Sequence, residues 1–551
     1  YTAAGKTGSA EYDTASGERG THSWFVGYTN VDNPELAIAV IAEDGGSGSS
    51  TAVPIAKYIF DTYYQQSSGK IEEIFSFYKK SLGKVFTSTQ NSLEKVCFFW
   101  YTASKHIGRD TMLRRKVEQT LLTWKNTPNR KPLILKGCRQ CGKTYSVLEF
   151  AKKNYEHTVY LNFFENPQFV SVFSGSLEVD HITMLLSALM GRAAVFEPGK
   201  TLLVLDEIQD CPDARTALKF FKLDGRYDVI GTGSLLGVKG YGEKEPKSVP
   251  VGYETVLDMT PLDFEEFLWA NGITEPVIEL LRQCMQSGSP VPDALHQRMR
   301  ELLLQYTVVG GMPDAVQTFV DTKRMDEVLQ IQRDIIRSYE DDMVKYADKK
   351  DKAVIRECFQ SIPKQLSKEN KKFQYSVVKK GATASKFAGS LQWIEDAGII
   401  TRCYNLSITE LPLDGNADPD VFKVYMKDTG LFISMLEDGT QFDILQGNLL
   451  GYKGAIFEGL IADIFSKMGR KLYYFHKDSG LEVDFIIRYK GECTLVEVKA
   501  VSGNTKSAKT ILRHPEKYHV YRLIKLGDYN VGHTEQLLTL PLYMAFLLTD
   551  M

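Results

Sequence analysis

The chain has 551 residues, of which 43% are hydrophobic and 25% are charged, and its formal net charge is −3. This length is several times that of a typical domain and the composition is ordinary for a globular protein, so we expect two to four domains with separate cores. The small net charge excludes a general attraction to nucleic acids or membranes, and any such binding must come from a local patch.

The cysteines and the apolar runs indicate a reduced protein without membrane spans. Eight cysteines are too sparse in this chain for a disulfide scaffold. Cys138 and Cys141 form a C-x-x-C pair, but no second Cys or His pair follows at zinc-finger spacing, which disfavours a metal or redox role. No apolar run approaches the roughly 18 residues of a membrane span, and no segment has a signal-peptide pattern. We therefore expect a cytoplasmic protein without membrane contact.

Residues 1–66 predict two strands followed by a helix. The segments "AGKTGSAE", "HSWFVGY" and "ELAIAVIAEDG" are similar to the end of the penicillin-binding transpeptidase domain, in which Lys6, Thr7 and Gly8 would line the active site. The nucleophile of such enzymes lies in an S-x-x-K element well upstream of the K-T-G element. In this chain the S-x-x-K matches begin at Ser76 and Ser361, so they follow the K-T-G element and stand in the wrong order. We expect this fragment to be inactive. Residues 67–111 are basic, fit no motif and predict a connector.

From Met112, strands and helices alternate to about residue 270, which predicts an α/β fold. The sequence "GCRQCGKT" at 137–144 matches G-x-x-x-x-G-K-T, follows a predicted strand and opens a predicted helix. In this context Gly137 and Gly142 let backbone N–H groups wrap phosphates, Lys143 neutralises β- and γ-phosphate charge, and Thr144 reaches Mg²⁺. The segment therefore predicts a phosphate-binding loop, or P-loop.

A second element supports the P-loop. The apolar segment "TLLVLDEIQ" at 201–209 predicts a strand that ends in Asp206 and Glu207. Asp206 is placed to hold the Mg²⁺ water shell and Glu207 to polarise the attacking water, although two acids could also merely cap the next helix. With the P-loop upstream, the pair predicts binding of ATP with Mg²⁺, and hydrolysis.

A third strand, "YDVIGTGSLLG" at 227–237, ends in hydroxyl residues. Thr232 or Ser234 is a candidate sensor of the γ-phosphate, and we include Ser234 among the nucleotide-binding residues, although a plain turn explains the pattern about as well. Many arginines could serve as an arginine finger, and Arg139 and Arg215 are two to test.

The segments "RKPLILKGCRQCGKTYSVLEFA", "LLVLDEIQDCP", "VPVGYETVLDMTPLDFEEFL" and "YTVVGGMPDAV" resemble a large prokaryotic family of AAA-type ATPases with a C-terminal domain of unknown function. The resemblance runs from Met112 nearly to the end of the chain. It implies ATP-dependent action without an established substrate.

The middle of the chain is predominantly helical. Residues 351–415 include "YSVVKKGATASKFAGSLQWIEDAGIITRCYN", which predicts helix, turn, helix and strand and is similar to a winged helix. A helix of this kind that carries Lys or Arg can enter a DNA groove, but many such modules only pack domains together. DNA or RNA is therefore a candidate partner.

The C-terminal segment carries a group of acids and a lysine. Glu458 lies on the predicted helix "AIFEGLIADIF", Asp484 ends "LEVD", and Glu497 and Lys499 share one face of the predicted strand "LVEVKA". The spacing resembles the P-D-(D/E)-x-K nuclease superfamily, whose carboxylates hold Mg²⁺. The first Pro of the pattern is absent. An inactive, nucleic-acid-binding or purely structural domain is the alternative.

We thus expect an α/β protein with an AAA-type P-loop NTPase domain, a helical and winged-helix middle, a restriction-endonuclease-like C-terminal domain and a small N-terminal transpeptidase fragment. The leading function is ATP hydrolysis coupled to an unknown partner, a nucleic acid or a protein. The alternative is a nucleotide-gated switch, toxin or defence component with little turnover. The predicted boundaries are 1–66, 67–111, 112–272, 273–350, 351–415 and 416–551.

The two ends of the chain point to different compartments. Transpeptidases work outside the membrane, whereas an ATPase needs cytosolic ATP, and nothing between residues 66 and 112 could cross a bilayer. We therefore expect residues 1–66 to be the tail of one gene fused to a complete ATPase that begins at Met112.

Overall fold

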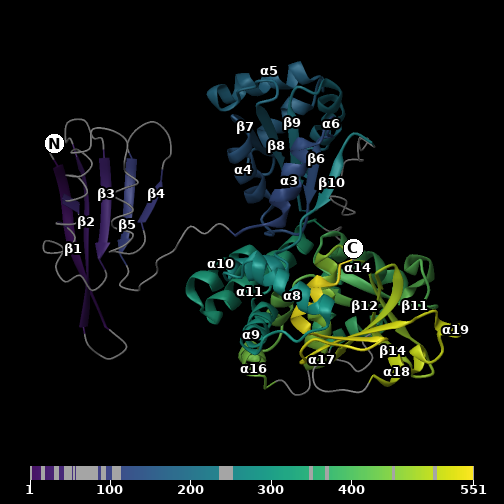
Figure 1. Ribbon diagram of the computed structural model, residues 1–551. Helices are drawn as coiled ribbons and strands as arrows, with labels where there is room; N and C mark the ends of the chain where they lie inside the picture. Colours follow the sequence, from purple (N-terminus) through teal and green to yellow (C-terminus); the bar gives the residue numbers. More distant parts are fainter. Residues whose placement is uncertain are drawn as a thin grey trace. The chain divides into compact units, whose positions relative to one another are not determined.

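The computed structural model divides the chain into two units, Tyr1–Met112 and Leu113–Met551 (Figure 1). The residues that it describes are 3–13, 19–29, 36–42, 53, 56–57, 85–88, 95–101, 113–234, 252–346, 352–366, 372–448, 453–499 and 505–549. Among these residues, no helix combines the length and the apolar character that a bilayer span requires.

The first unit contains a five-stranded sheet with the order β1-β2-β3-β5-β4. Its pairs are antiparallel except for β3 and β5, which are parallel. Lys6 and Thr7 lie on β1, opposite Val26 and Phe25 of β2. The strands are β1 Ala3–Asp13, β2 Arg19–Thr29, β3 Leu36–Ala42, β4 Val85–Ser88 and β5 Lys95–Tyr101.

Three of these strands differ from the sequence prediction. Residues 1–66 were expected to form two strands, but β1 adds a third. β4 and β5 fall within residues 67–111, where we expected a connector. The segment of β5, "KVCFFWY", contains four aromatic residues and one valine, which are residue types that favour a strand. Of the predicted helix at 52–64, only Val53, Ala56 and Lys57 are described, and they are helical.

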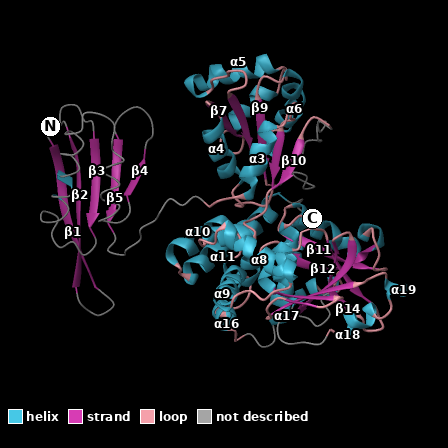
Figure 2. Ribbon diagram, in the orientation of Figure 1, coloured by secondary structure: helices cyan, strands magenta, loops and turns pink. Residues whose placement is uncertain are grey.

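The second unit begins with a parallel five-stranded sheet of order β10-β6-β9-β8-β7. Side chains alternate across it, so that Leu133 and Leu135 pack on the face covered by α3 and α4, whereas Ile134 packs on the face covered by α5 and α6 (Figure 2). This three-layer arrangement confirms the predicted α/β fold. The strands are β6 Leu133–Lys136, β7 His157–Asn162, β8 Thr201–Asp206, β9 Asp228–Gly233 and β10 Thr255–Asp258; the helices are α3 Lys116–Asn126, α4 Lys143–Asn154, α5 Val179–Met190 and α6 Pro212–Asp224, with 3₁₀ turns at Pro167–Phe173, Gly191–Ala193 and Ile208–Asp210.

A helical region follows, as the sequence predicts. Its first helix is fixed by a capping box, in which Asp263 accepts a hydrogen bond from the Glu266 backbone N–H and the Glu266 carboxylate accepts one from the Asp263 N–H. The helices are α7 Phe264–Ala270, α8 Glu275–Ser287, α9 Asp293–Val309, α10 Pro313–Thr322 and α11 Met325–Tyr346.

The segment predicted to resemble a winged helix forms three helices and a two-stranded antiparallel hairpin. The helices are α12 Lys352–Leu366, α13 Tyr375–Val378 and α14 Ala384–Asp396, and the hairpin strands are β11 Ile400–Leu406 and β12 Ala417–Met426. β11 also pairs in parallel with β13, so the hairpin belongs to the C-terminal sheet. The boundary that we expected between residues 415 and 416 therefore falls inside one sheet, because backbone pairing continues across it.

The C-terminal sheet has eight strands in the order β12-β11-β13-β14-β15-β16-β18-β17. Helix α17 packs on one face and α18 on the other. One apolar core runs from Leu262 to Leu548, so the helical region and this sheet share a core instead of forming the separate ones expected. The strands are β13 Leu472–His476, β14 Glu482–Tyr489, β15 Glu492–Lys499, β16 Arg522–Gly527, β17 Gly532–His533 and β18 Leu537–Pro541; the helices are α15 Thr429–Ser434, α16 Thr440–Gln446, α17 Lys453–Lys467, α18 Lys506–Leu512 and α19 Pro515–Tyr518, with 3₁₀ turns at Leu413–Asn416 and Leu542–Leu547.

Candidate functional site

The P-loop joins β6 to α4 at the carboxyl edge of the parallel sheet. A side chain at Gly137 would place its Cβ 2.1 Å from the Met259 carbonyl oxygen, so only glycine fits there. Gly142 has a φ of 94°, a left-handed conformation that favours glycine, and it directly precedes α4. The two glycines therefore allow the loop backbone to turn its N–H groups toward a phosphate group at the helix N-terminus.

Lys143 lies folded back on the loop. Its Nζ donates hydrogen bonds to the carbonyl oxygens of Gly137 at 3.0 Å and Cys138 at 2.8 Å, and the side chain is buried. The ammonium group thus occupies the inside of the loop, where phosphate oxygens would replace the two carbonyl oxygens as its partners.

Asp206 accepts hydrogen bonds from several polar side chains at the carboxyl edge of the parallel sheet. The Thr144 hydroxyl lies 3.1 Å from both carboxylate oxygens, the Tyr160 hydroxyl donates at 2.7 Å, and the Asn162 amide at 3.4 Å. The Thr232 hydroxyl donates to Oδ1. Sequence reasoning missed Tyr160 and Asn162, although polar residues near the end of an apolar strand, "VYLN", are the signal that would have found them.

Glu207 follows Asp206 in a left-handed conformation, with a φ of 50°. Its backbone N–H donates to Asp206 Oδ1 at 3.2 Å, and its carboxylate accepts a hydrogen bond from the Gln209 amide. Burial raises the pKa of Glu207 above its ordinary value, and the Asp206 charge adds to the rise. A carboxylate that is partly desolvated and close to the P-loop has the properties of a general base.

Of the two predicted sensor candidates, Thr232 is the one that contacts Asp206. Ser234 lies buried just beyond β9. The rest of the predicted strand segment, residues 235–237, lies outside the described residues.

Helix α11 of the helical region contacts the P-loop through two side chains. The Arg139 guanidinium forms an ion pair with Asp342, and the Tyr339 hydroxyl donates to the Arg139 carbonyl oxygen at 3.1 Å. Arg215 forms a two-pronged ion pair with Glu254 through bonds of 2.6 and 3.1 Å. Both arginines proposed as fingers are thus engaged with acids of their own chain, and Arg139 instead links the P-loop to α11.

The structure brings the four predicted C-terminal residues together. Glu497 and Lys499 lie on β15 and form an ion pair, and Lys499 Nζ lies 3.9 Å from Asp484 Oδ2. Asp484 on β14 accepts a hydrogen bond from the Val498 N–H at 2.8 Å. Glu458 on α17 is near enough for its charge to act on both Asp484 and Lys499. We call these four residues the carboxylate cluster.

The sequence prediction missed three further members of this environment. Lys423 of β12 is almost fully buried, and its Nζ lies 3.1 Å from both Glu458 Oε1 and Glu482 Oε1. The Tyr425 hydroxyl donates to Glu458 Oε1. Lys423 and Tyr425 precede the predicted nuclease pattern by more than 30 residues in the sequence. Only the pairing of the β11–β12 hairpin with β13 brings them to the cluster.

Charge crowding changes the acidity of the cluster. Burial and the Asp484 charge raise the pKa of Glu497 to about 7. Burial and the charge of Glu458 raise the pKa of Asp484 above its ordinary value. Carboxylates that repel one another in a desolvated site gain from a cation among them, which is the setting of a divalent metal site.

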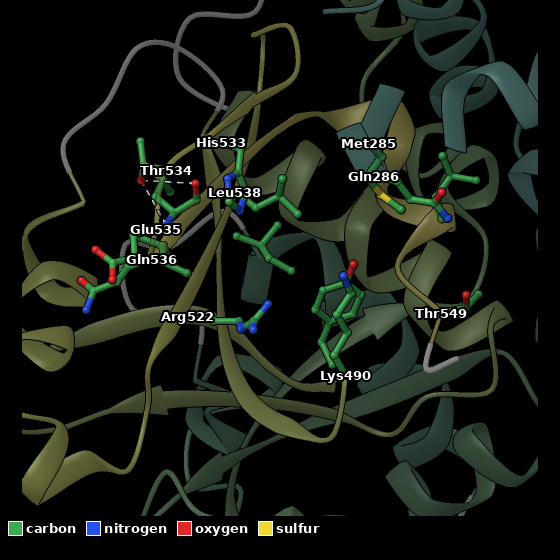
Figure 3. Close-up of a pocket in the computed structure, with 15 residues that line it drawn as sticks. Met285, Gln286, Lys490, Arg522, His533, Thr534, Glu535, Gln536, Leu538 and Thr549 are labelled. Atoms are coloured by element: carbon green, nitrogen blue, oxygen red, sulfur yellow. Dashed lines mark hydrogen bonds between the residues drawn. The ribbon is translucent and has the colours of Figure 1, made fainter. Parts of the chain in front are cut away.

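Two cavities of this unit differ in their relation to the predicted sites. One, of about 950 Å³, lies between the P-loop and the C-terminal sheet and is lined by Gly137, Cys138 and Ser234 on the P-loop side. The other, of about 340 Å³, lies beside β16–β18; Lys490, Arg522 and His533 are among the side chains around it (Figure 3). It lies at the hairpin end of β14 and β15, away from the carboxylate cluster, and none of the predicted residues lines it.

Family models match separate segments of the chain. Residues 129–268 match an AAA domain, and residues 1–61 match the penicillin-binding protein transpeptidase domain. Residues 453–543 match a domain of unknown function (DUF4143), and residues 300–441 match another (DUF8612). The chain therefore carries an AAA-type P-loop ATPase domain, a C-terminal domain of a family without known function and an N-terminal transpeptidase fragment, as the motifs predicted.

Curated relatives match only a short stretch. The chain is 38% identical over 84 residues to peptidoglycan D,D-transpeptidase MrdA of Haemophilus influenzae, which is 13% of each protein. It is 36% identical over 59 residues to peptidoglycan D,D-transpeptidase PbpA of Mycolicibacterium smegmatis, which is 10% of this chain and 12% of that protein. The chain thus spans about an eighth of the length of these relatives.

Solved structures with remote similarity include a Walker-type ATPase of Pyrococcus abyssi, with 14% identity, a TM-score of 0.35 and coverage of 61% of this chain and 99% of that one. The ORC2 protein of Aeropyrum pernix in its ADP form has 13% identity and a TM-score of 0.25, over 60% of this chain and 92% of that one.

Proposed function

We propose that the AAA domain binds ATP with Mg²⁺ and hydrolyses it. The observation that carries this proposal is the meeting of the Thr144 hydroxyl with both oxygens of Asp206, at 3.1 Å. A P-loop hydroxyl and a strand-end carboxylate are the pair that holds Mg²⁺ in P-loop NTPases. The residues present therefore fit the metal and the nucleotide.

Each residue of the site has a separate role. Lys143 leaves the carbonyl oxygens of Gly137 and Cys138 and turns to the β- and γ-phosphates. Glu207 accepts the proton of the attacking water, and the Thr232 hydroxyl helps to orient Asp206. Thr144 and Asp206 would hold Mg²⁺, which would supply positive charge to neutralise the phosphates.

ATP turnover by the full chain tests this function. We expect Lys143→Ala and Glu207→Gln to lower the rate by about 100-fold or more, because each removes a group that acts on the transferred phosphate. Lys136→Ala is the matched control, since this half-exposed lysine is paired with Asp258 at the same sheet edge. A wild-type rate no higher than that of Lys143→Ala would contradict ATPase activity. The alternative of a nucleotide-gated switch would then require that the wild type, but not Lys143→Ala, bind a fluorescent ATP analogue.

We propose that ATP is coupled to a partner through the contact between α11 and the P-loop. Arg139 is held by Asp342, and Tyr339 holds the Arg139 carbonyl group. A nucleotide that changes the loop must therefore change these contacts, and α11 transmits the change to the C-terminal part of the unit through the shared core. The partner that we propose is DNA or RNA, bound at the α12–α14 segment, which has the helix order of a winged helix. The use of ATP also leads us to propose a cytoplasmic location.

A second candidate function is metal-dependent cleavage of nucleic acid at the carboxylate cluster. The observation that favours it is the convergence of Asp484, Glu497 and Lys499, from two paired strands, beside Glu458. Two carboxylates suit Mg²⁺, and a lysine beside them suits the charge that develops on a phosphate.

Incubation of the full chain with DNA or RNA and Mg²⁺ tests the second function. We expect cleavage by the wild type and its loss, by about 100-fold or more, in Asp484→Asn. Glu492→Gln is the matched control, because this exposed acid lies at the far end of β15 and pairs with Arg522. Equal cleavage by wild type and Asp484→Asn would indicate a contaminating nuclease. No cleavage by either would leave the inactive, structural alternative.

A further inference from the structure

The P-loop carries two thiols that the proposed nucleotide chemistry does not use. Cys138 and Cys141 flank a turn formed by Arg139 and Gln140, and Gln140 has a φ of 62°. The end Cα atoms of a β-turn lie within about 7 Å of each other, and a disulfide spans roughly 4.4–6.8 Å between Cα atoms. The backbone therefore holds the two cysteines within reach of a disulfide.

Their side chains also face each other. Each thiol is the largest single influence on the pKa of the other, so the two sulfurs are close neighbours, and both are buried and reduced. The Cys141 Sγ lies 3.5 Å from the Met259 carbonyl oxygen, underneath Gly137. The hydrogen bond from Cys138 lowers the pKa of Cys141 to about 6, and the charges of Lys143 and Arg115 add to the effect.

A small molecule has a route to this pair. Cys138 lines the cavity of about 950 Å³ that separates the P-loop from the C-terminal sheet. Gly398, just before β11, lies against the Cys138 backbone, where a Cβ would come within 3.3 Å of the Cys138 nitrogen. Cys138 therefore adjoins a space large enough for a peroxide molecule, whereas Cys141 lies wholly in the core.

We propose that Cys138 and Cys141 are a redox modification site, at which hydrogen peroxide converts the two thiols into an intraloop disulfide that blocks nucleotide binding. The blocking effect rests on the proposed binding of ATP at the same loop. One sulfur, as thiolate, attacks a peroxide oxygen; the O–O bond breaks, a sulfenic acid forms, and hydroxide leaves and takes up a proton. The second sulfur attacks the sulfenic sulfur, the S–S bond forms and water leaves. Two thiols lose two electrons, and one peroxide becomes two water molecules.

The disulfide opposes nucleotide binding through the shape of the loop. A phosphate requires the backbone N–H groups of the loop to turn toward it, whereas an S–S bond fixes the turn between the two cysteines. In the present conformation the carbonyl oxygens of Gly137 and Cys138 hold Lys143. A cross-linked loop keeps Lys143 on these oxygens and away from phosphate.

The test uses the full chain, treated with hydrogen peroxide, alkylated and mapped by mass spectrometry, with affinity for a fluorescent ATP analogue measured in parallel. We expect a Cys138–Cys141 cross-link, a loss of affinity of about tenfold or more, and recovery with dithiothreitol. The variants Cys138→Ser and Cys141→Val should keep their affinity for the analogue in the presence of peroxide. Valine is chosen at position 141 because this site is fully buried and apolar, so a serine hydroxyl would be unfavourable there. Cys211→Ala, which removes a lone buried thiol of the same domain, should behave like the wild type.

Two results would overturn the proposal: an oxidised P-loop peptide without the cross-link, or a cross-linked protein with unchanged nucleotide affinity. Saturation with the analogue before oxidation should protect the pair, and unprotected thiols in the saturated protein would also count against it. If the reduced wild type binds no analogue, the proposed ATP site fails, and the mass measurement still decides whether the disulfide forms.

Discussion

The P-loop site and the carboxylate cluster each contain a lysine and nearby acidic residues, but they are built differently. In the P-loop site most of the ligand-wrapping groups are backbone groups, and Lys143 rests on two carbonyl oxygens. In the carboxylate cluster the groups are charged side chains, and the adjoining Lys423 lies between Glu458 of the cluster and Glu482. A site made of backbone can lose its lysine without burying an unpaired charge, whereas a site made of buried charges cannot.

The largest effect that separates the two sites is on stability. We expect Lys423→Met to lower the free energy of unfolding by about 3–5 kcal/mol, because Glu458 would be left buried without its cation. Lys143→Met should cost less than about 1 kcal/mol, because its partners are neutral carbonyl groups. Urea unfolding of both variants measures the difference. Equal losses would show that the two lysines have the same structural role.

The pH dependence of stability sharpens the comparison at the carboxylate cluster. The pKa of Glu497 is about 7 in the folded protein, above the ordinary value of 4.5, so the folded state holds the proton more tightly. Stability is therefore highest below the ordinary pKa and falls as pH rises through the folded pKa, by about 3 kcal/mol. Thermal unfolding between about pH 4.5 and pH 8 measures this slope, which Glu497→Gln should remove. A slope of the same size in that variant would contradict the assignment.

A smaller effect is expected where α11 meets the P-loop. Asp342→Asn should change the affinity for a fluorescent ATP analogue by only about threefold, since a partly exposed ion pair contributes about 1 kcal/mol or less. It should also abolish the slowing of hydrogen exchange that nucleotide produces in α11. Arg337→Ala is the control, because Arg337 pairs with Asp334 on the exposed face of the same helix. Unchanged α11 protection in Asp342→Asn would rule out this route of coupling.

The smallest effect concerns the acid limb of ATP turnover. Because the pKa of Glu207 is raised, its base form is lost at a higher pH than for an ordinary glutamate. We expect the turnover rate to fall on acidification at a pH above the ordinary glutamate pKa, while the affinity for the nucleotide analogue stays nearly constant. A turnover rate that stays flat down to the ordinary glutamate pKa would mean that Glu207 does not act as the base.

The contrast between the two sites also explains how much the sequence could predict. The P-loop residues lie within eight consecutive positions and Asp206 ends an apolar strand, so local spacing located Lys143, Thr144 and Asp206. Tyr160 and Thr232 reach the same carboxylate only because parallel strands place their carboxyl ends along one edge. The sheet order, which is not local, decided these contacts.

The sequence by itself determined the α/β character, the P-loop and the acids of the C-terminal strands, because hydrophobic alternation and short motifs are local properties. Only the tertiary structure placed Lys423 beside Glu458, tied Arg139 to Asp342 and joined the helical region and the C-terminal sheet in one core. Lys423 and Glu458 are 35 positions apart in the sequence, and Arg139 and Asp342 are 203 positions apart. Chain packing decides such pairs, because no local pattern specifies which distant charges will be buried together.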